Sequence, residues 1–183
     1  MRPKNARGWH SQEIPRDVEE DVTKVPEGID IRLACPEEAQ QLSAMARAMV
    51  TDMASYGGHA VSTEQSSWDE LADMFKGQIE DADYRCLVAE SSEAKLVGFA
   101  GGEARLLGGA FEQKRTLHIS AVYVLPEFRS RGIAESLLKA LLAWGREVEC
   151  AEAELNILRD NPAYPLYEKL GFMEFQRQLL RRL

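Results

Sequence analysis

Stretches in which apolar and polar residues alternate predict β-strands, because successive side chains of a strand point to opposite faces of a sheet. Residues 29–33 form such a stretch, with Ile29, Ile31 and Leu33 on one face. A hairpin is expected next, since two apolar stretches flank a polar turn at residues 91–94. The strands expected along the chain are 29–33, 84–90, 95–103, 116–125, 151–158 and a last strand or hairpin at 172–183.

Apolar residues that recur every three or four positions predict helices between these strands. Pro36 suits the first turn of a helix, and Gly57 and Gly58 mark its end. A second helix is expected from about Ser67, where Ser67 and Glu70 have the spacing of a capping box. The first helix carries an apolar stripe that we interpret as core: Ala39, Leu42, Met45, Ala46, Met49, Val50 and Met53.

A third helix, expected over residues 133–148, separates the strands at 116–125 and 151–158. Such a unit forms a right-handed crossover, so its two strands are expected to be parallel. Together with the hairpin upstream, this predicts an α/β fold with a mixed sheet and helices on both faces. We interpret residues 29–183 as a single domain. Residues 1–28 are polar, contain three prolines and show no period, which predicts an extended N-terminal arm.

Composition and charge narrow the classes of partner. With 45% hydrophobic and 28% charged residues, the chain has the make-up of an ordinary globular protein. A net charge of −8 argues against nucleic acid as a partner and suits the attraction of a cationic substrate. No apolar run approaches the ~18–20 residues that cross a membrane. Residues 1–12 lack the apolar core of a secretory signal.

The three cysteines, Cys35, Cys86 and Cys150, are widely spaced and form no C-x-x-C pair, so no metal site is predicted. Their odd number favours reduced thiols, which predicts a cytoplasmic protein. Cys86 lies in an expected strand and is interpreted as a small core residue rather than a nucleophile.

The turn before the helix at 133–148 predicts a phosphate-binding site. Pro126 ends the preceding strand, because proline cannot donate to a sheet. Free N–H groups at a helix start, with the positive end of the helix dipole, attract an anion. Arg129 and Arg131 add charge, and Gly132 lets a phosphate approach the backbone. We interpret the anion as a pyrophosphate.

Arg129-x-x-Gly132-x-Ala134, after a strand that ends Val124-x-Pro126, resembles the acetyl-CoA signature of the GNAT acetyltransferases. The resemblance implies a GNAT-like fold, a central twisted sheet of about six to seven strands flanked by about four helices. It also implies acetyl-CoA as the cosubstrate. The pyrophosphate would then bind the backbone N–H groups of Arg129, Ser130, Arg131, Gly132, Ile133 and Ala134.

A second block, residues 161–172, resembles the last motif of the same family. Physically, an Asn-Pro pair opens a short helix that Gly171 ends. By the resemblance, Asn161 contacts the pantetheine arm, and Tyr167 lies beside the thioester sulfur as the general acid. Tyr164, on the same helix face, is an alternative acid. The chain departs from the family in that Asn161 lies six positions before Tyr167, where seven is usual.

The strand before the phosphate turn is where the resemblance places the thioester. Splaying of this strand from the one at 151–158 would free an edge at Val122, Tyr123 and Val124. Its N–H groups can bind pantetheine amides and stabilise an oxyanion on the carbonyl. The reaction implied is attack by a neutral amine on the acetyl group, with a base that takes the amine proton.

His118 is the first candidate for that base, because a histidine titrates near neutral pH. Glu103 and Glu112 are the alternatives. Family members often carry an acidic residue near Ala121, and this chain has none there. Without a bulge, His118 would share a strand face with Ser120, Val122 and Val124.

No motif specifies the acceptor, because loops form such pockets. By the resemblance, Met53, Tyr56, His59 and Trp68 are candidates to face it, with plain loop and core as the alternative. The first hypothesis is an N-acetyltransferase acting on a primary amine of a small molecule or peptide, which Tyr167 favours. The second is a non-catalytic sensor or interaction module that binds CoA or acyl-CoA, and a third is an unrelated α/β nucleotide-binding protein. A homodimer is left open.

Overall fold

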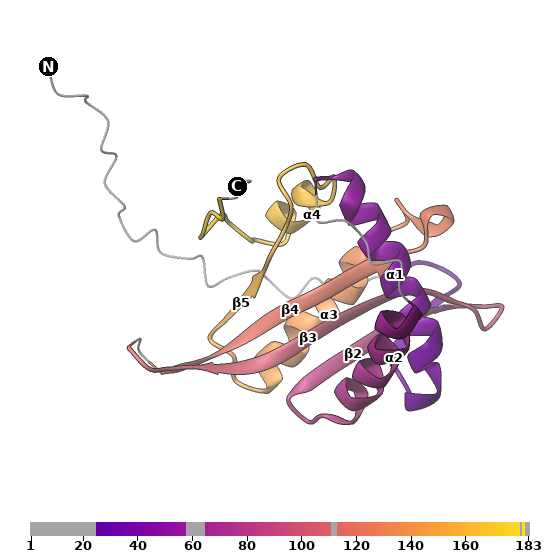
Figure 1. Ribbon diagram of the computed structural model, residues 1–183, viewed down its shortest axis with the longest axis horizontal. Helices are drawn as coiled ribbons and strands as arrows, with labels where there is room; N and C mark the ends of the chain where they lie inside the picture. Colours follow the sequence, from indigo (N-terminus) through magenta and orange to yellow (C-terminus); the bar gives the residue numbers. More distant parts are fainter. Residues whose placement is uncertain (1–24, 58–64, 111–112, 180, 182–183) are drawn as a thin grey trace, which may run out of the picture.

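The computed structural model describes residues 25–57, 65–110, 113–179 and 181 (Figure 1). Within them, five strands form one sheet in the order β1-β2-β3-β4-β5. The strands are β1 (Ile29–Leu33), β2 (Tyr84–Ser91), β3 (Leu96–Leu107), β4 (Lys114–Val124) and β5 (Glu152–Leu155). The helices are α1 (Ala39–Ser55), α2 (Gln65–Glu80), α3 (Ile133–Glu147) and α4 (Tyr164–Lys169), with 3₁₀ turns η1 (Pro36–Glu38) and η2 (Pro126–Phe128).

β1, β2, β3 and β4 follow one another across the sheet, and each pair of neighbours is antiparallel. β5 runs parallel to β4, with Thr116 opposite Glu152 and Ile119 opposite Leu155. α3 connects the two strands, which confirms the expected crossover. The mixed α/β architecture predicted from the sequence is therefore confirmed.

α3 covers one face of the sheet, and α1 and α2 cover the other (Figure 1). On the α3 face, Leu137 and Leu141 are fully buried in one cluster with Leu117 of β4. On the opposite face, Phe99 of β3 meets Phe75 of α2 edge to face, with ring centroids 5.7 Å apart. Each fully buried leucine contributes about 1.5–3 kcal/mol, so both faces of the sheet stabilise the fold.

A β-bulge interrupts the ladder between β3 and β4. Gly101 pairs with Ala121 and Gly102 pairs with Ile119, which leaves Ser120 between two paired residues. One extra residue shifts the alternation of side chains along the strand. Residues of β4 on both sides of the bulge accordingly pack on the α3 face: Leu117, Ile119, Val122 and Val124.

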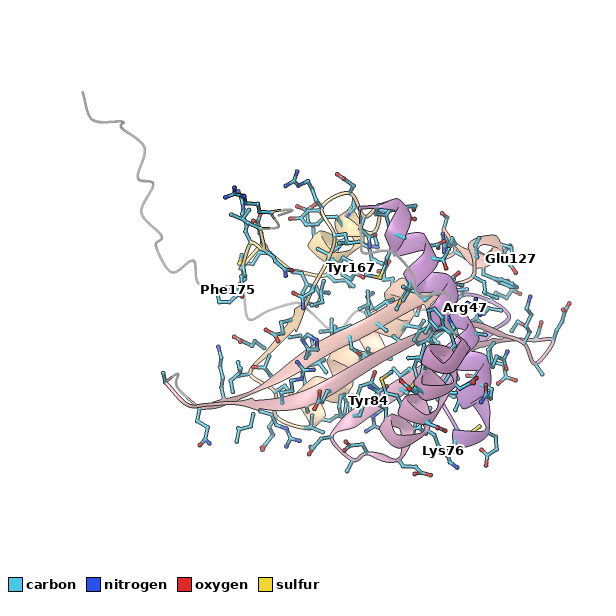
Figure 2. The ribbon with its side chains drawn as sticks, in the orientation of Figure 1. Arg47, Lys76, Tyr84, Glu127, Tyr167 and Phe175 are labelled. Atoms are coloured by element: carbon cyan, nitrogen blue, oxygen red, sulfur yellow. The ribbon has the colours of Figure 1, made fainter. Side chains whose placement is uncertain are left out.

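The last strand predicted, over 172–183, is not formed in the part of this segment that the structure describes. Met173, Phe175 and Leu179 are exposed, and Figure 2 shows Phe175 away from the sheet. The apolar residues of this segment can pack on a sheet, but the backbone groups of a strand also need a partner edge. The expectation of six to seven strands is therefore too high for the described residues, which form five.

Residues 1–24 of the expected N-terminal arm lie outside the described part of the chain, so the division between residues 1–28 and 29–183 stays a prediction. The described end of that segment leads directly into β1, where the Ile29 N–H donates to the Pro26 carbonyl (3.1 Å). None of the helices described here combines the length and the apolar character needed to cross a bilayer.

Candidate active site

η2 and the turn after it lead from the end of β4 to the start of α3. Ser130 and Gly132 in this turn both have left-handed backbone conformations, with φ of 60° and 84°. Gly132 is the N-cap of α3, and this φ suits a residue without a Cβ. A Cβ placed there would meet nothing closer than Cγ of Pro26, at 3.8 Å. The backbone at Gly132 is therefore open to an approaching ligand.

The start of α3 offers backbone N–H groups to an anion. The Ser136 N–H donates to the Gly132 carbonyl (3.0 Å), so the amides ahead of Ser136 have no acceptor one turn back within the helix. Glu135 in the first turn would oppose an anion, but its carboxylate pairs with Lys169 (2.7 Å) and Lys139 (3.3 Å). The helix start thus keeps the positive character that attracts phosphate.

The two arginines of the turn are held in different ways. Arg129 donates from Nε to the Val124 carbonyl (2.9 Å) and from Nη2 to the Asp52 carboxylate (2.5 Å). Arg131 donates from Nη2 to the Glu127 backbone carbonyl (2.9 Å) and has no carboxylate partner among the described residues. Arg129 is therefore tied to the protein by an ion pair, whereas Arg131 is held by neutral groups.

β5 leaves β4 after Ile119. The parallel pairing covers Thr116 to Ile119 and stops there, so residues 120–124 have no strand beside them on this side in the described part of the chain. Figure 1 shows β5 bending away from β4 towards α4. The splaying expected from the sequence is confirmed. It leaves a free strand edge at residues 122–124, next to the phosphate turn.

α4 carries Tyr167, which packs against the same α3-face core as Val122 and Val124 of this edge; Figure 2 shows the residue above β4 in that view. Its ring packs edge to face on Phe172, with centroids 6.0 Å apart, and joins the margin of the α3-face core. Burial raises the pKa of the Tyr167 phenol above its ordinary value. Among the residues described, the hydroxyl has no hydrogen-bond partner, so its proton is available to a ligand.

Asn161 precedes α4, and its Oδ1 accepts from the Ala163 N–H (2.9 Å). The side chain thus holds the turn that opens the helix, as an asparagine does in an Asx turn. Its amide nitrogen keeps its donors. Tyr164, the alternative acid, is more than one third exposed and lies one turn before Tyr167.

His118 lies between two carboxylates in the sheet. It is opposite Glu103 of β3 and opposite Glu154 of β5. Its Nδ1 is 3.1 Å from Oε1 of Glu154, whereas Glu103 pairs with Arg105 (2.7 Å). Glu154 can therefore orient the imidazole.

The bulge determines which side chains of β4 lie on the same sheet face as His118. Its neighbours Leu117 and Ile119 pack towards α3, so the imidazole lies on the face that α1 and α2 cover. A face shared with Val122 and Val124 is expected only for a strand without a bulge; with the bulge present, both valines pack towards α3 and His118 does not. The bulge is the physical reason for the difference.

The other sequence candidates fall into three groups. Glu112 and His59 lie outside the described residues, so their roles stay predictions. Trp68 is buried, with the Arg47 guanidinium 5.0 Å from its ring centroid, which fits the alternative of core. Tyr56 and Met53, at the end of α1, stay partly exposed.

Sequence reasoning missed Asp52 and Glu154, which contact Arg129 and His118 from other elements. Neither carboxylate belongs to a motif, and no local signal marks them. No cluster of three metal-binding side chains occurs in the part of the chain that the structure describes.

Comparison with known proteins adds independent findings. The model of the family described as "Acetyltransferase (GNAT) family" matches residues 46–172. The aminoglycoside N(6')-acetyltransferase type 1 of Salmonella typhimurium is 27% identical over 108 residues, which cover 57% of this chain and 74% of the relative. The enzyme of the same name from Stenotrophomonas maltophilia is 28% identical over 120 residues, covering 63% of this chain and 76% of the relative.

Solved structures share the fold at lower identity. A putative acetyl transferase from Pyrococcus furiosus superposes with a TM-score of 0.67 at 18% identity, covering 85% of this chain and 99% of that chain. The aminoglycoside N-acetyltransferase AAC(6')-Iy, solved in complex with CoA, has a TM-score of 0.65 at 20% identity, covering 85% and 94%.

Proposed function

Because the chain belongs to the GNAT acetyltransferase family, we propose that it transfers the acetyl group of acetyl-CoA to a primary amine of a small cationic molecule. The observation that carries the proposal is the parting of β5 from β4 after Ile119, beside Tyr167 and the start of α3. The proposal takes the free strand edge, the helix start and the phenol of Tyr167 as parts of one site. A peptide amine remains the alternative acceptor.

The described residues fit acetyl-CoA. The backbone at Gly132 is unobstructed. The Arg129 N–H donates to the Pro126 carbonyl (3.3 Å), so the amides from Ser130 to Ala134 are the groups proposed to bind the pyrophosphate. The free edge at residues 122–124 offers peptide groups to the amides of pantetheine, and the donors of Asn161 lie before α4. The cosubstrate supplies an activated acetyl group, held as a thioester.

Tyr167 is proposed as the general acid. Burial raises the pKa of its phenol, so the hydroxyl stays protonated at neutral pH and can donate to the departing sulfur. A partner on the protein would compete for this proton, and none exists among the described residues. Tyr164 is the alternative, and its greater exposure makes it the weaker choice.

His118 is proposed as the base that takes the proton of the attacking amine, directly or through water. Its contact with Glu154 fixes the ring and directs the other nitrogen away from the carboxylate. Glu103 is less suited, since its carboxylate already pairs with Arg105. The base lies one position before the point where the parallel pairing ends.

Aminoglycosides are the first acceptor class to test. The curated relatives reported above are named for this substrate, and an acidic protein with a net charge of −8 attracts such polyamines. The carboxylate of Glu154 beside His118 gives the attraction a local source, whereas the charge of Glu103 is offset by Arg105. Glu154 lies on β5, one of the two strands that diverge.

Thermal melting with acetyl-CoA, CoA and ATP tests the cosubstrate. A ligand at a hundred times its dissociation constant adds about 2.7 kcal/mol of stability, so acetyl-CoA and CoA should raise the Tm while ATP should not. The acceptor is then tested by measuring the release of free thiol from acetyl-CoA with the aminoglycoside neamine and, in a separate assay, with a lysine-containing peptide. Absence of any Tm shift at millimolar acetyl-CoA would rule out the proposal.

A further inference from the structure

Arg129 is held by three groups of the protein itself. Its Nε donates to the carbonyl of Val124, the last residue of β4, and its Nη2 donates to Asp52 in the last turn of α1. Its guanidinium also lies 5.4 Å from the ring centroid of Tyr123. One side chain therefore joins the phosphate turn, the end of the free strand edge and the end of α1.

The placement of Asp52 is unfavourable for α1 alone. A carboxylate in the last turn of a helix faces the negative end of the helix dipole, which destabilises the helix. The charge of Arg129 offsets this interaction, at a distance of 2.5 Å. The pair therefore gives Asp52 a tertiary role that the helix by itself does not explain.

The turn itself needs support. Ser130 has a φ of 60°, which an L residue adopts only where its surroundings hold it. Ser130 follows Arg129 directly, so the contacts of Arg129 fix the turn at the residue before the strained one. Arg131, on the other side, makes no ion pair with any described residue and keeps an uncompensated charge.

We infer that Arg129 is a positioning residue, which holds the phosphate turn in its binding conformation through Asp52 and Val124. The backbone amides and Arg131 then meet the phosphate, while the Arg129 side chain does not. This inference rests on the proposed function. The ion pair also connects the phosphate turn to the end of α1, where Tyr56 and Met53, two candidates to face the acceptor, are located.

The alternative is that the Arg129 side chain binds the phosphate directly. The direction in which Asp52→Asn changes the CoA affinity distinguishes the two. If Arg129 binds phosphate directly, Asp52 competes for it, and removing the carboxylate strengthens CoA binding. Removal of a negative charge near an anionic ligand also favours binding. If Arg129 positions the turn, the variant weakens CoA binding, because a smaller fraction of the protein has the competent turn.

Isothermal titration of the full chain with CoA is the experiment. Asp52→Asn and Arg129→Gln should each weaken binding by about fivefold, the limit that an exposed ion pair sets. The double variant should bind no more weakly than Arg129→Gln alone, since that substitution already removes the contact with Asp52 together with the one to Val124. In steady-state kinetics with acetyl-CoA and the aminoglycoside neamine, the KM for acetyl-CoA should rise in each of the two single variants, while kcat changes little.

Glu127→Gln is the matched control, because it removes a carboxylate beside the same turn whose partner is Lys95. It should leave the CoA affinity unchanged or raise it slightly, because it removes a negative charge near the anionic ligand without loosening the turn. An Asp52→Asn variant that binds CoA as tightly as the wild type, or more tightly, would overturn the inference and leave the proposed function standing. A wild-type protein that binds no CoA would overturn both.

Discussion

The hydroxyl oxygens of Tyr84 on β2 and Ser120 on β4 lie 2.8 Å apart, although β3 runs between their strands. The phenol crosses β3 at Gly101, where a Cβ would collide with its oxygen. Ser120 also donates to the Gly101 carbonyl (3.2 Å). Gly101 leaves room for the Tyr84 phenol, and the bulge places the Ser120 hydroxyl within hydrogen-bond distance of it. The glycine and the bulge therefore belong to one arrangement, two residues along β4 from His118.

Gly101→Ala should destabilise the protein by about 1–3 kcal/mol, because the new methyl group forces Tyr84 or the sheet to move. Urea unfolding measures the loss. In the double variant with Tyr84→Phe, the nearest clashing atom is gone and part of the stability should return. The ring carbon that bears the hydroxyl would still lie 3.1 Å from the methyl group, so the recovery is incomplete.

Gly77→Ala is the control for this substitution. Gly77 is exposed in α2, and a Cβ there meets nothing within 4 Å. Alanine should stabilise the helix by about 1 kcal/mol. Equal effects of the two substitutions would contradict the role given to Tyr84.

The sheet and its crossover were predictable because they rest on local patterns. The alternation in residues 29–33 and the helical period in 133–148 report the burial of each element directly. Gly98, Gly101 and Gly102 favour a bulge or a close backbone approach along β3, and the register shifts between Gly101 and Gly102. No local pattern shows that Ser120 is the extra residue on β4, although this decides which residues share a sheet face with His118.

Contacts between distant elements were also beyond the sequence. Arg129 was predictable as part of a basic turn, but its partner Asp52 lies 77 positions earlier in the chain. Their meeting depends on how α1 ends against the turn. The strand predicted at 172–183 is not formed in its described part for a related reason: no local signal supplies the neighbouring strand with which it would have to pair.

Tyr167→Phe should lower kcat by about a hundredfold, the range that general acid catalysis supplies, while CoA affinity barely changes. The ring and its packing on Phe172 are kept, and only the proton donor is lost. Steady-state kinetics with acetyl-CoA and neamine, with CoA titration, measures both quantities. Tyr164→Phe is the control; a loss in that variant instead would transfer the role of acid to Tyr164.

The pH dependence of kcat offers a separate check on Tyr167. A phenol with an ordinary pKa of about 10 would lose its proton at that pH, but burial raises the pKa of Tyr167. The midpoint of its loss of function as an acid should therefore lie above pH 10. A decline of kcat near neutral pH that disappears in Tyr167→Phe would contradict the raised pKa.

His118→Gln should lower kcat/KM by about a hundredfold, because the variant has no group that can take a proton. Glu154→Gln should lower it less, since the amide can still orient the ring while the charge is lost. The expected order is therefore His118→Gln below Glu154→Gln below wild type. Glu103→Gln should have little effect, and a larger loss there would identify Glu103 as the base.

Glu38→Gln should lower the free energy of unfolding by about 1–2 kcal/mol at pH 7, since Glu38 binds both Arg32 (2.7 Å) and the Cys35 N–H (2.9 Å). The Arg32 guanidinium, with the Cys35 N–H, holds the pKa of Glu38 below its ordinary value. A depressed pKa stabilises the fold above the unfolded value of about 4.3 and loses this effect as the pH falls through the folded value. Urea unfolding at pH 7 and pH 3 should therefore show the two proteins converging in acid. Glu37→Gln, one position away and exposed, removes the same charge and should cost little; a gap for Glu38→Gln that stays constant with pH would show that charge plays no part.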